Sequence, residues 1–157
     1  MTRRIDVLNI AGHLGEEVAV SEWLEITQDR INRFADATGD RQWIHVDAAR
    51  AAAESPFHAT IAHGFLTLSL VSALAQQAMT IGPIRMAINY GVNRVRFVAP
   101  VPAGSRIRGR FTLAAVTEAE GGVQVTWSVT IEREHGDKPC GVADWLVRYY
   151  PQEGRDG

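Results

Sequence analysis

Cysteine is nearly absent from this chain, since Cys140 is the single thiol in 157 residues. It cannot form a disulfide within the chain, and such low cysteine usage is typical of a reducing compartment. No uninterrupted apolar run approaches the roughly 18 residues that a membrane-spanning helix needs. The basic start MTRRID is not followed by the apolar stretch of a signal peptide. These absences predict a cytoplasmic protein with no membrane partner.

An excess of charge of one sign is also missing. The 16 Lys and Arg residues against 18 Asp and Glu residues give a formal net charge of -2. This balance offers no electrostatic attraction for nucleic acid. Hydrophobic residues make up 46% and charged residues 22%, as in ordinary globular proteins. We therefore expect residues 1–157 to form one domain, with the polar, glycine-rich end 151–157 fraying.

Several signatures of well-known sites are absent as well. The sequence has no G-x-S-x-G elbow, no phosphate-binding P-loop and no G-x-G-x-x-G turn. His45, His58 and His63 could form a three-histidine set, but no cysteine or acidic residue stands at ligand spacing from them. The sequence therefore predicts no metal.

The first half of the chain contains helix signals around one short connection. A β-branched strand is predicted over 17–26, followed by Thr27 as the N-cap of a helix over 28–38. Gly39 suits a left-handed helix exit, and Asp47 suits the N-cap of a second, short helix. The segment DRQWIH is then a helix-to-helix connection, where side chains can converge on a cleft.

A buried helix and an antiparallel meander are predicted downstream. Residues 63–79 are apolar on nearly all sides, as expected of a helix enclosed by other elements. Period-two alternation then marks strands, two of which flank the turn EAEGG. The predicted strands cover 85–100, 105–115, 122–132 and 140–150. Together these elements predict an α+β fold in which a sheet curls around a central helix.

Three arginines, Arg106, Arg108 and Arg110, share one face of a predicted strand. We expect a solvated face, with contact to a phosphate-bearing ligand as the alternative.

Asp40 and His45 form the first candidate site, five residues apart beside the bulky Trp43 and Ile44. An acid and an imidazole that hold one water can exchange protons with a substrate, and adding water across a double bond needs that exchange. Apolar neighbours would desolvate both groups. The alternative is structural: a carboxylate just past a helix end and a histidine satisfied in a junction, with Trp43 and Ile44 as core residues.

Gly64 is the second candidate, because it lies at the predicted start of the buried helix. Free backbone N–H groups there can stabilise a developing oxyanion, and glycine permits close approach. The alternative is that Gly64 only provides a tight entry to the helix.

Two stretches in the right order, FADATGDRQWIHVD and SPFHATIAHGFLTLSL, resemble the MaoC-like dehydratases, the (R)-specific enoyl-CoA hydratases, and most closely their NodN-like branch. The resemblance implies a hot-dog fold, in which a curved antiparallel sheet wraps a long central helix. It implies that Asp40 and His45 hold the catalytic water and that the Gly64 N–H binds the thioester carbonyl. One feature departs from the family pattern G-D-x-N-P-aliphatic-H: Gln42 and Trp43 replace Asn and Pro, which changes the stiffness of the loop.

The same resemblance implies a hydro-lyase of fatty-acid metabolism that interconverts trans-2-enoyl-CoA and (3R)-hydroxyacyl-CoA. It implies a homodimer and no cofactor, since CoA is part of the substrate. Gln42, Trp43, His63 and Phe65 are expected to line the substrate pocket. An acyl-CoA thioesterase and a non-catalytic acyl-CoA-binding subunit are the alternatives, because one fold can host several activities.

Overall fold

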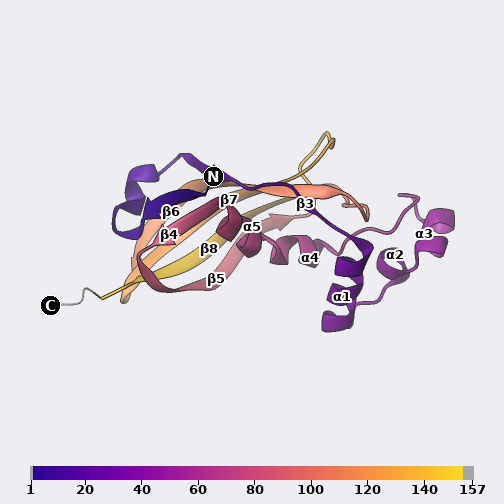
Figure 1. Cartoon of the computed structure of the whole chain (residues 1–157), viewed down its shortest axis with the longest axis horizontal. Helices are drawn as coiled ribbons and strands as arrows, with labels where there is room; N and C mark the ends of the chain where they lie inside the picture. The colour runs from indigo at the N-terminus through magenta and orange to yellow at the C-terminus, as the bar shows by residue number, and fades with distance from the viewer. Residues whose placement is uncertain (1, 154–157) are drawn as a thin grey trace.

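An antiparallel sheet forms the main layer of the structure, a computed structural model that describes residues 2–153 (Figure 1). Its strand order is β2-β6-β7-β8-β5, and β3 pairs with β6 beside β2. The strands are β2 (Glu17–Val20), β3 (Leu24–Glu25), β5 (Ile84–Arg96), β6 (Arg106–Ala119), β7 (Gly122–Arg133) and β8 (Gly141–Pro151). The long strands therefore confirm the predicted meander. The predicted first strand over 17–26 is divided into β2 and β3.

Apolar residues at every second position of the strands form the core. In β6, Phe111 and Leu113 are fully buried, and Leu113 pairs with the fully buried Trp127 of β7. Side chains two apart point to one face of a strand, so the apolar set faces the interior while the set between them faces outward. Gly121, with φ of 75°, makes the left-handed turn between β6 and β7.

The outward set includes the three arginines, and each has a carboxylate partner. Arg106 Nη1 lies 3.2 Å from Glu134 Oε2, Arg108 Nε lies 2.7 Å from Glu132 Oε2, and Arg110 Nη2 lies 2.7 Å from Glu17 Oε1. Cross-strand ion pairs of this kind are typical of a solvated sheet face, which is the environment expected for these arginines.

The buried helix is built from two consecutive helical segments, α4 (Gly64–Ser69) and α5 (Val71–Ala78). Leu70 between them keeps right-handed helical angles, φ −77° and ψ −12°, so the chain continues in one direction. Leu66 and Leu74 are at most 5% exposed, as expected of a helix surrounded by other elements. Figure 1 shows both segments lying against the sheet.

Three further helices gather at one end of the sheet (Figure 1): α1 (Gln28–Thr38), α2 (Trp43–Val46) and α3 (Ala48–Glu54). The predicted caps are confirmed. Thr27 Oγ1 accepts from Arg30 N at 3.1 Å, Gly39 has φ of 82°, and Asp47 Oδ1 accepts from Arg50 N at 3.0 Å. The predicted helix-to-helix connection itself contains a short helix, α2, which places His45 on a helical turn.

The N-terminal segment has structure that the sequence did not predict. Strand β1 (Arg3–Asp6) pairs in parallel with β4 (Met79–Gly82), and a 3₁₀ helix, η1 (Val7–His13), follows it. Ile5, Val7 and Ile10 are buried there. Across residues 2–153, every helix is too short or too polar to cross a membrane. Residues 154–157 of the tail that was expected to fray lie outside the described part.

Candidate active site

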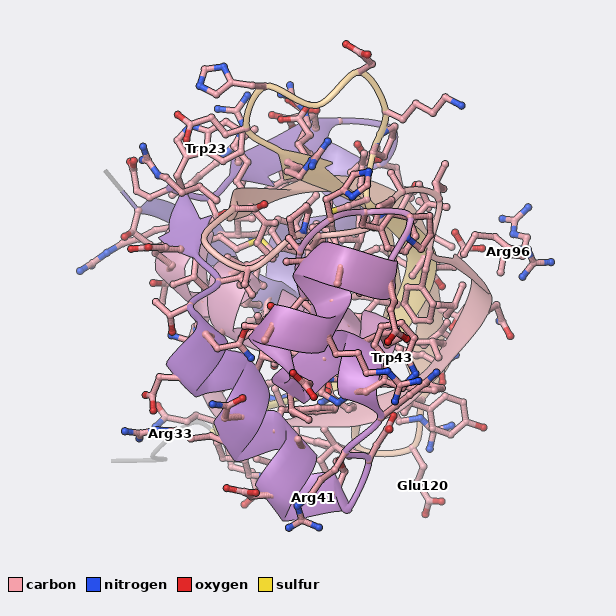
Figure 2. All side chains as sticks on the ribbon, turned by 90° about the vertical axis from the view of Figure 1, so that its right-hand side faces the viewer. Trp23, Arg33, Arg41, Trp43, Arg96 and Glu120 are labelled. Atoms are coloured by element: carbon pink, nitrogen blue, oxygen red, sulfur yellow. The ribbon has the colours of Figure 1, made fainter. Side chains whose placement is uncertain are left out.

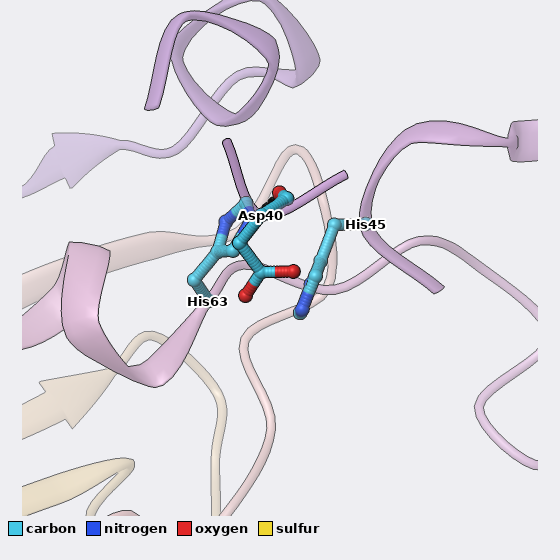
Figure 3. Close-up of side chains that lie close together, drawn as sticks. All are labelled: Asp40, His45 and His63. Carbon is cyan, nitrogen blue, oxygen red and sulfur yellow. Dashed lines mark hydrogen bonds between the residues drawn. The ribbon is translucent and has the colours of Figure 1, made fainter. Parts of the chain in front are cut away.

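Asp40 and His45 approach each other where α1 ends and α2 begins. Asp40 follows Gly39, the left-handed C-cap of α1, and its side chain is exposed, whereas His45 is 7% exposed. One ligand atom from each of Asp40, His45 and His63 lies within 4.8 Å of the others. Figure 3 shows the Asp40 carboxylate directed toward the His45 ring. The predicted acid and imidazole therefore come together.

His45 is fixed through its ring and through its backbone. Its Nδ1 lies 2.7 Å from the carbonyl oxygen of Ile61, and its own carbonyl accepts from Gln28 Nε2 at 2.7 Å. A carbonyl can only accept, so Nδ1 carries the proton and Nε2 keeps its lone pair for proton exchange. Gln28 is held in turn by the hydroxyl of Thr60.

The Ile61 carbonyl is itself positioned by an extended segment over 60–63. Ile61 N donates to Ile44 O at 3.0 Å, and Ala62 N donates to Val101 O at 2.8 Å. Ala103 N donates to Thr60 O at 2.9 Å. These bonds tie α2 to the chain that leads into β6, so the orientation of His45 depends on the main body of the fold.

His63 lies beside the pair and is 3% exposed. Its ring stacks on that of His45 with centroids 3.8 Å apart and planes 23° apart. Its Nε2 lies 2.9 Å from the backbone oxygen of Asp40. The three side chains are near enough to suggest a metal-binding set, but Nε2 of His63 is occupied by this carbonyl. His63 therefore uses one ring nitrogen to hold the Asp40 backbone, while the Asp40 carboxylate and Nε2 of His45 are the groups of the predicted acid–imidazole pair.

Gly64 begins α4 at the edge of a pocket of about 280 Å³ that also contacts His45. Among residues 2–153 no side chain caps this helix, so the N–H groups of its first residues can bond another partner. A Cβ on Gly64 would lie 2.5 Å from Cδ2 of Phe97. A side chain at this position would therefore force the Phe97 ring to shift. The pocket is lined by His45, Phe57, Ile61, Ala62, Gly64, Thr67, Phe97, Val98, Ala99, Pro100, Val101 and Cys140.

The other predicted pocket residues lie outside this lining. Gln42 is exposed, and Phe65 is 68% exposed with its ring edge-on to Phe97. Trp43 is half-buried and lies under the guanidinium of Arg50, 4.2 Å from the ring centroid. Figure 2 shows Trp43 on the helical end of the molecule. His63 packs against His45 and does not line the pocket.

Several residues of the site carried no recognisable sequence signal. Phe97 and Cys140 line the pocket from β-strand ends far along the chain, and Gln28 supports His45 from the first turn of α1. Their roles depend on which segments pack together, so no local pattern could have identified them.

A larger apolar pocket of about 360 Å³ lies along α5, between this helix and strands β5 and β8. Trp145 and Asn89 meet at its wall, where Trp145 Nε1 donates to Asn89 Oδ1 at 3.0 Å.

Solved structures place this architecture in a known class. The (R)-hydratase PhaJ1 from Pseudomonas aeruginosa superposes with a TM-score of 0.69 at 24% identity, covering 88% of this chain and 83% of that one. The monoamine oxidase regulatory protein from Archaeoglobus fulgius gives a TM-score of 0.75 at 23% identity, covering 97% and 99%. The fold is the predicted hot-dog fold.

Sequence comparison then identifies the family. The MaoC like domain matches residues 9–134. The chain is 53% identical over 144 residues to 3-hydroxyacyl-thioester dehydratase Z of Mycobacterium tuberculosis, covering 91% of this chain and 95% of the relative. It is 43% identical over 157 residues to nodulation protein N of Rhizobium leguminosarum bv. viciae, covering 98% of each. The protein belongs to the MaoC-like family, and this membership supports its assignment to the hydro-lyases.

The buried Cys140 gives a prediction about the pocket wall. Burial raises the pKa of its thiol to about 11, and the residue is 1% exposed. At pH 8 a thiol with that pKa is thiolate in about one chain in a thousand, so it should hardly react. We expect much less than one equivalent of dye from native protein with a thiol-reactive reagent, and one equivalent after denaturation. Rapid stoichiometric labelling of the native protein would contradict the buried position.

Proposed function

We propose that this protein catalyses the reversible, (R)-specific hydration of trans-2-enoyl-CoA to (3R)-hydroxyacyl-CoA, as part of fatty-acid metabolism. The observation that carries the proposal is the free Nε2 of His45 beside the Asp40 carboxylate, at the pocket where α4 begins. The similarity to a 3-hydroxyacyl-thioester dehydratase supports a thioester substrate.

The chemistry requires Asp40 and His45 to share one exchangeable proton. A water held between them adds its oxygen to C3 of the enoyl thioester while one group takes a proton from that water. The other group delivers its proton to C2 on the same face, so the pair ends with the one proton it began with. The bond from Nδ1 to Ile61 O keeps Nε2 of His45 as the exchanging atom in both directions.

Gly64 supplies the electrostatic part of the proposal. As water adds to C3, negative charge moves toward the thioester oxygen. The backbone N–H at the uncapped start of α4 would donate a hydrogen bond to that oxygen and stabilise its enolate character.

The proposed reaction needs no redox cofactor, because adding water changes no overall oxidation state, and it uses the Gly64 N–H rather than a metal to polarise the carbonyl. CoA enters as part of the substrate. We place the reaction in the cytoplasm, in keeping with the near absence of cysteine.

Asp40→Asn and His45→Gln test the pair. Each removes a proton-exchanging group while keeping a side chain of similar size, so kcat should fall by about 10²–10⁴-fold. The measurement is loss of enoyl absorbance with a series of enoyl-CoAs of increasing length, together with circular dichroism and stereochemical analysis of the product. Near wild-type rates in both variants would remove these residues from the mechanism.

The same assay, run with a thiol-reactive dye, separates the alternatives. Loss of the enoyl signal without free thiol supports hydration, whereas release of CoA thiol would indicate a thioesterase. Tight acyl-CoA binding with no turnover at any chain length would indicate a binding subunit.

Gly64→Ala tests the helix start. The added methyl group displaces the Phe97 ring, which is 44% exposed and can move, and it crowds the approach to the backbone N–H. We expect the variant to fold and its kcat/KM to fall by at least about tenfold. Removing one oxyanion donor altogether costs about 10²–10³-fold, and crowding it should cost part of that. Gly12→Ala is the matched control, because a Cβ there meets nothing within 4 Å. Equal activity of Gly64→Ala and Gly12→Ala would show that an open approach to the Gly64 N–H is not needed for the reaction.

We also propose that the enzyme is a homodimer that pairs along β5. This strand is at the edge of the sheet and has a neighbour, β8, on one side only among residues 2–153. Four apolar side chains along it are 39–55% exposed: Met86, Ile88, Tyr90 and Val92. A long apolar edge that is not covered pairs readily with another strand, and a second copy provides the matching one.

Light scattering tests the dimer. The wild-type mass should be about 34 kDa, twice the 17.2 kDa of the chain. The double variant Ile88→Glu, Tyr90→Glu should be monomeric, because like charges would meet across the pairing. Leu8→Glu, at a residue that is 73% exposed outside β5, should remain dimeric. A monomeric wild-type protein at micromolar concentration would refute the assembly.

A further inference from the structure

His63 makes one contact to each member of the proposed catalytic pair. Its Nε2 lies 2.9 Å from the Asp40 carbonyl oxygen, and its ring stacks on the His45 ring at 3.8 Å. On its other side, the ring of Phe34 lies 4.9 Å away. An imidazole packed between Phe34 of α1 and His45 of α2 thus contacts both members of the pair, Asp40 through its backbone and His45 through its ring.

His63 is poorly placed to touch substrate. It is 3% exposed and does not line the pocket that contains His45 and Gly64. In Figure 3 its ring lies behind Asp40, on the side of the Asp40 backbone and away from the end of the carboxylate. Any influence of His63 on the reaction must therefore act through its neighbours.

The hydrogen bond also selects one tautomer. The Asp40 carbonyl can only accept, so Nε2 of His63 must carry the proton. Nδ1 is then an acceptor, and it is buried with no hydrogen-bond partner among the described residues. Leaving a buried polar atom unpaired costs about 1–3 kcal/mol. A purely apolar ring would fill the same space without that cost. What the imidazole adds here is therefore its hydrogen bond to the Asp40 carbonyl.

We propose that His63 is a positioning residue for the hydration reaction: its Nε2–H fixes the backbone at Asp40, and its ring fixes the plane of His45. The inference rests on the proposed function of the Asp40–His45 pair. A shift of about 1 Å in a catalytic group can cost about 10²-fold in rate, so a support of this kind has a measurable effect.

Two substitutions separate the donor from the ring. His63→Gln keeps an N–H donor at a similar reach and loses the ring, whereas His63→Phe keeps the ring and loses the donor. We expect kcat of His63→Phe to fall by about 10²-fold. His63→Gln should stay within about tenfold of wild type. KM and the Kd of a saturated acyl-CoA should change less than about twofold in both, because His63 does not line the pocket. His58→Gln, at an exposed loop residue, is the control that should match wild type.

A double-mutant cycle with Asp40 distinguishes positioning from general destabilisation. In the Asp40→Asn background, His63→Phe should cost less than about threefold, because the group that it positions has already lost its chemistry. The same 10²-fold loss in both backgrounds, or equal losses in His63→Gln and His63→Phe, would overturn the proposal.

The tautomer of His63 gives a test that needs no catalysis. Nitrogen NMR of the histidine side chains of the wild-type protein should show His63 protonated at Nε2, with its signal assigned by its absence in His63→Gln. Protonation at Nδ1 would exclude the bond to the Asp40 carbonyl and refute the inference, even if hydration is confirmed. If the wild-type protein does not hydrate enoyl-CoA, the proposed function fails while this structural test still stands.

Discussion

The hydrogen bond from Nδ1 of His45 to the Ile61 carbonyl is the interaction on which the rest of the site depends. It sets the tautomer, so that Nε2 faces Asp40 with a free lone pair, and it fixes the plane of the ring on which His63 stacks. The carbonyl can do this because the segment 60–63 is bonded on one side to Ile44 and on the other to Val101. His45, the proposed proton-exchanging group, is therefore anchored to the core of the fold, although it stands in a cluster of short helices at one end of the sheet.

The buried helix provides the second fixed point. Enclosure by the sheet holds α4 and α5 in place, so the backbone N–H at Gly64 has a defined position relative to His45. Preorganised donors are effective because they need no rearrangement as charge develops. The Phe97 ring packs directly against the backbone at Gly64, where the absence of a side chain leaves room for it. A buried helix that begins at the pocket thus links core packing directly to the proposed chemistry.

Local signals in the sequence were sufficient for much of the fold. A cap such as Thr27 or Gly39 depends only on residues within one turn of the helix, and the alternation of a strand depends only on near neighbours in the sequence. Both could therefore be recognised without knowing the tertiary structure. Pairing of β1 with β4 and the support of His45 by Gln28 depend on contacts between distant segments. The stacking of His63 on His45 joins two residues 18 positions apart, so it too carried no local signal in the sequence.

The departure from the family pattern at Gln42 and Trp43 has a physical counterpart in the structure. A proline would stiffen the loop by fixing its own φ. Here Trp43 opens α2 and its ring lies under Arg50 of α3, a cation–π contact of the kind worth about 0.5–1 kcal/mol at exposed sites. That contact joins two short helices that could not be stable alone. The start of α2 is thus held by packing of the Trp43 ring against Arg50, at the position where the family pattern has a proline.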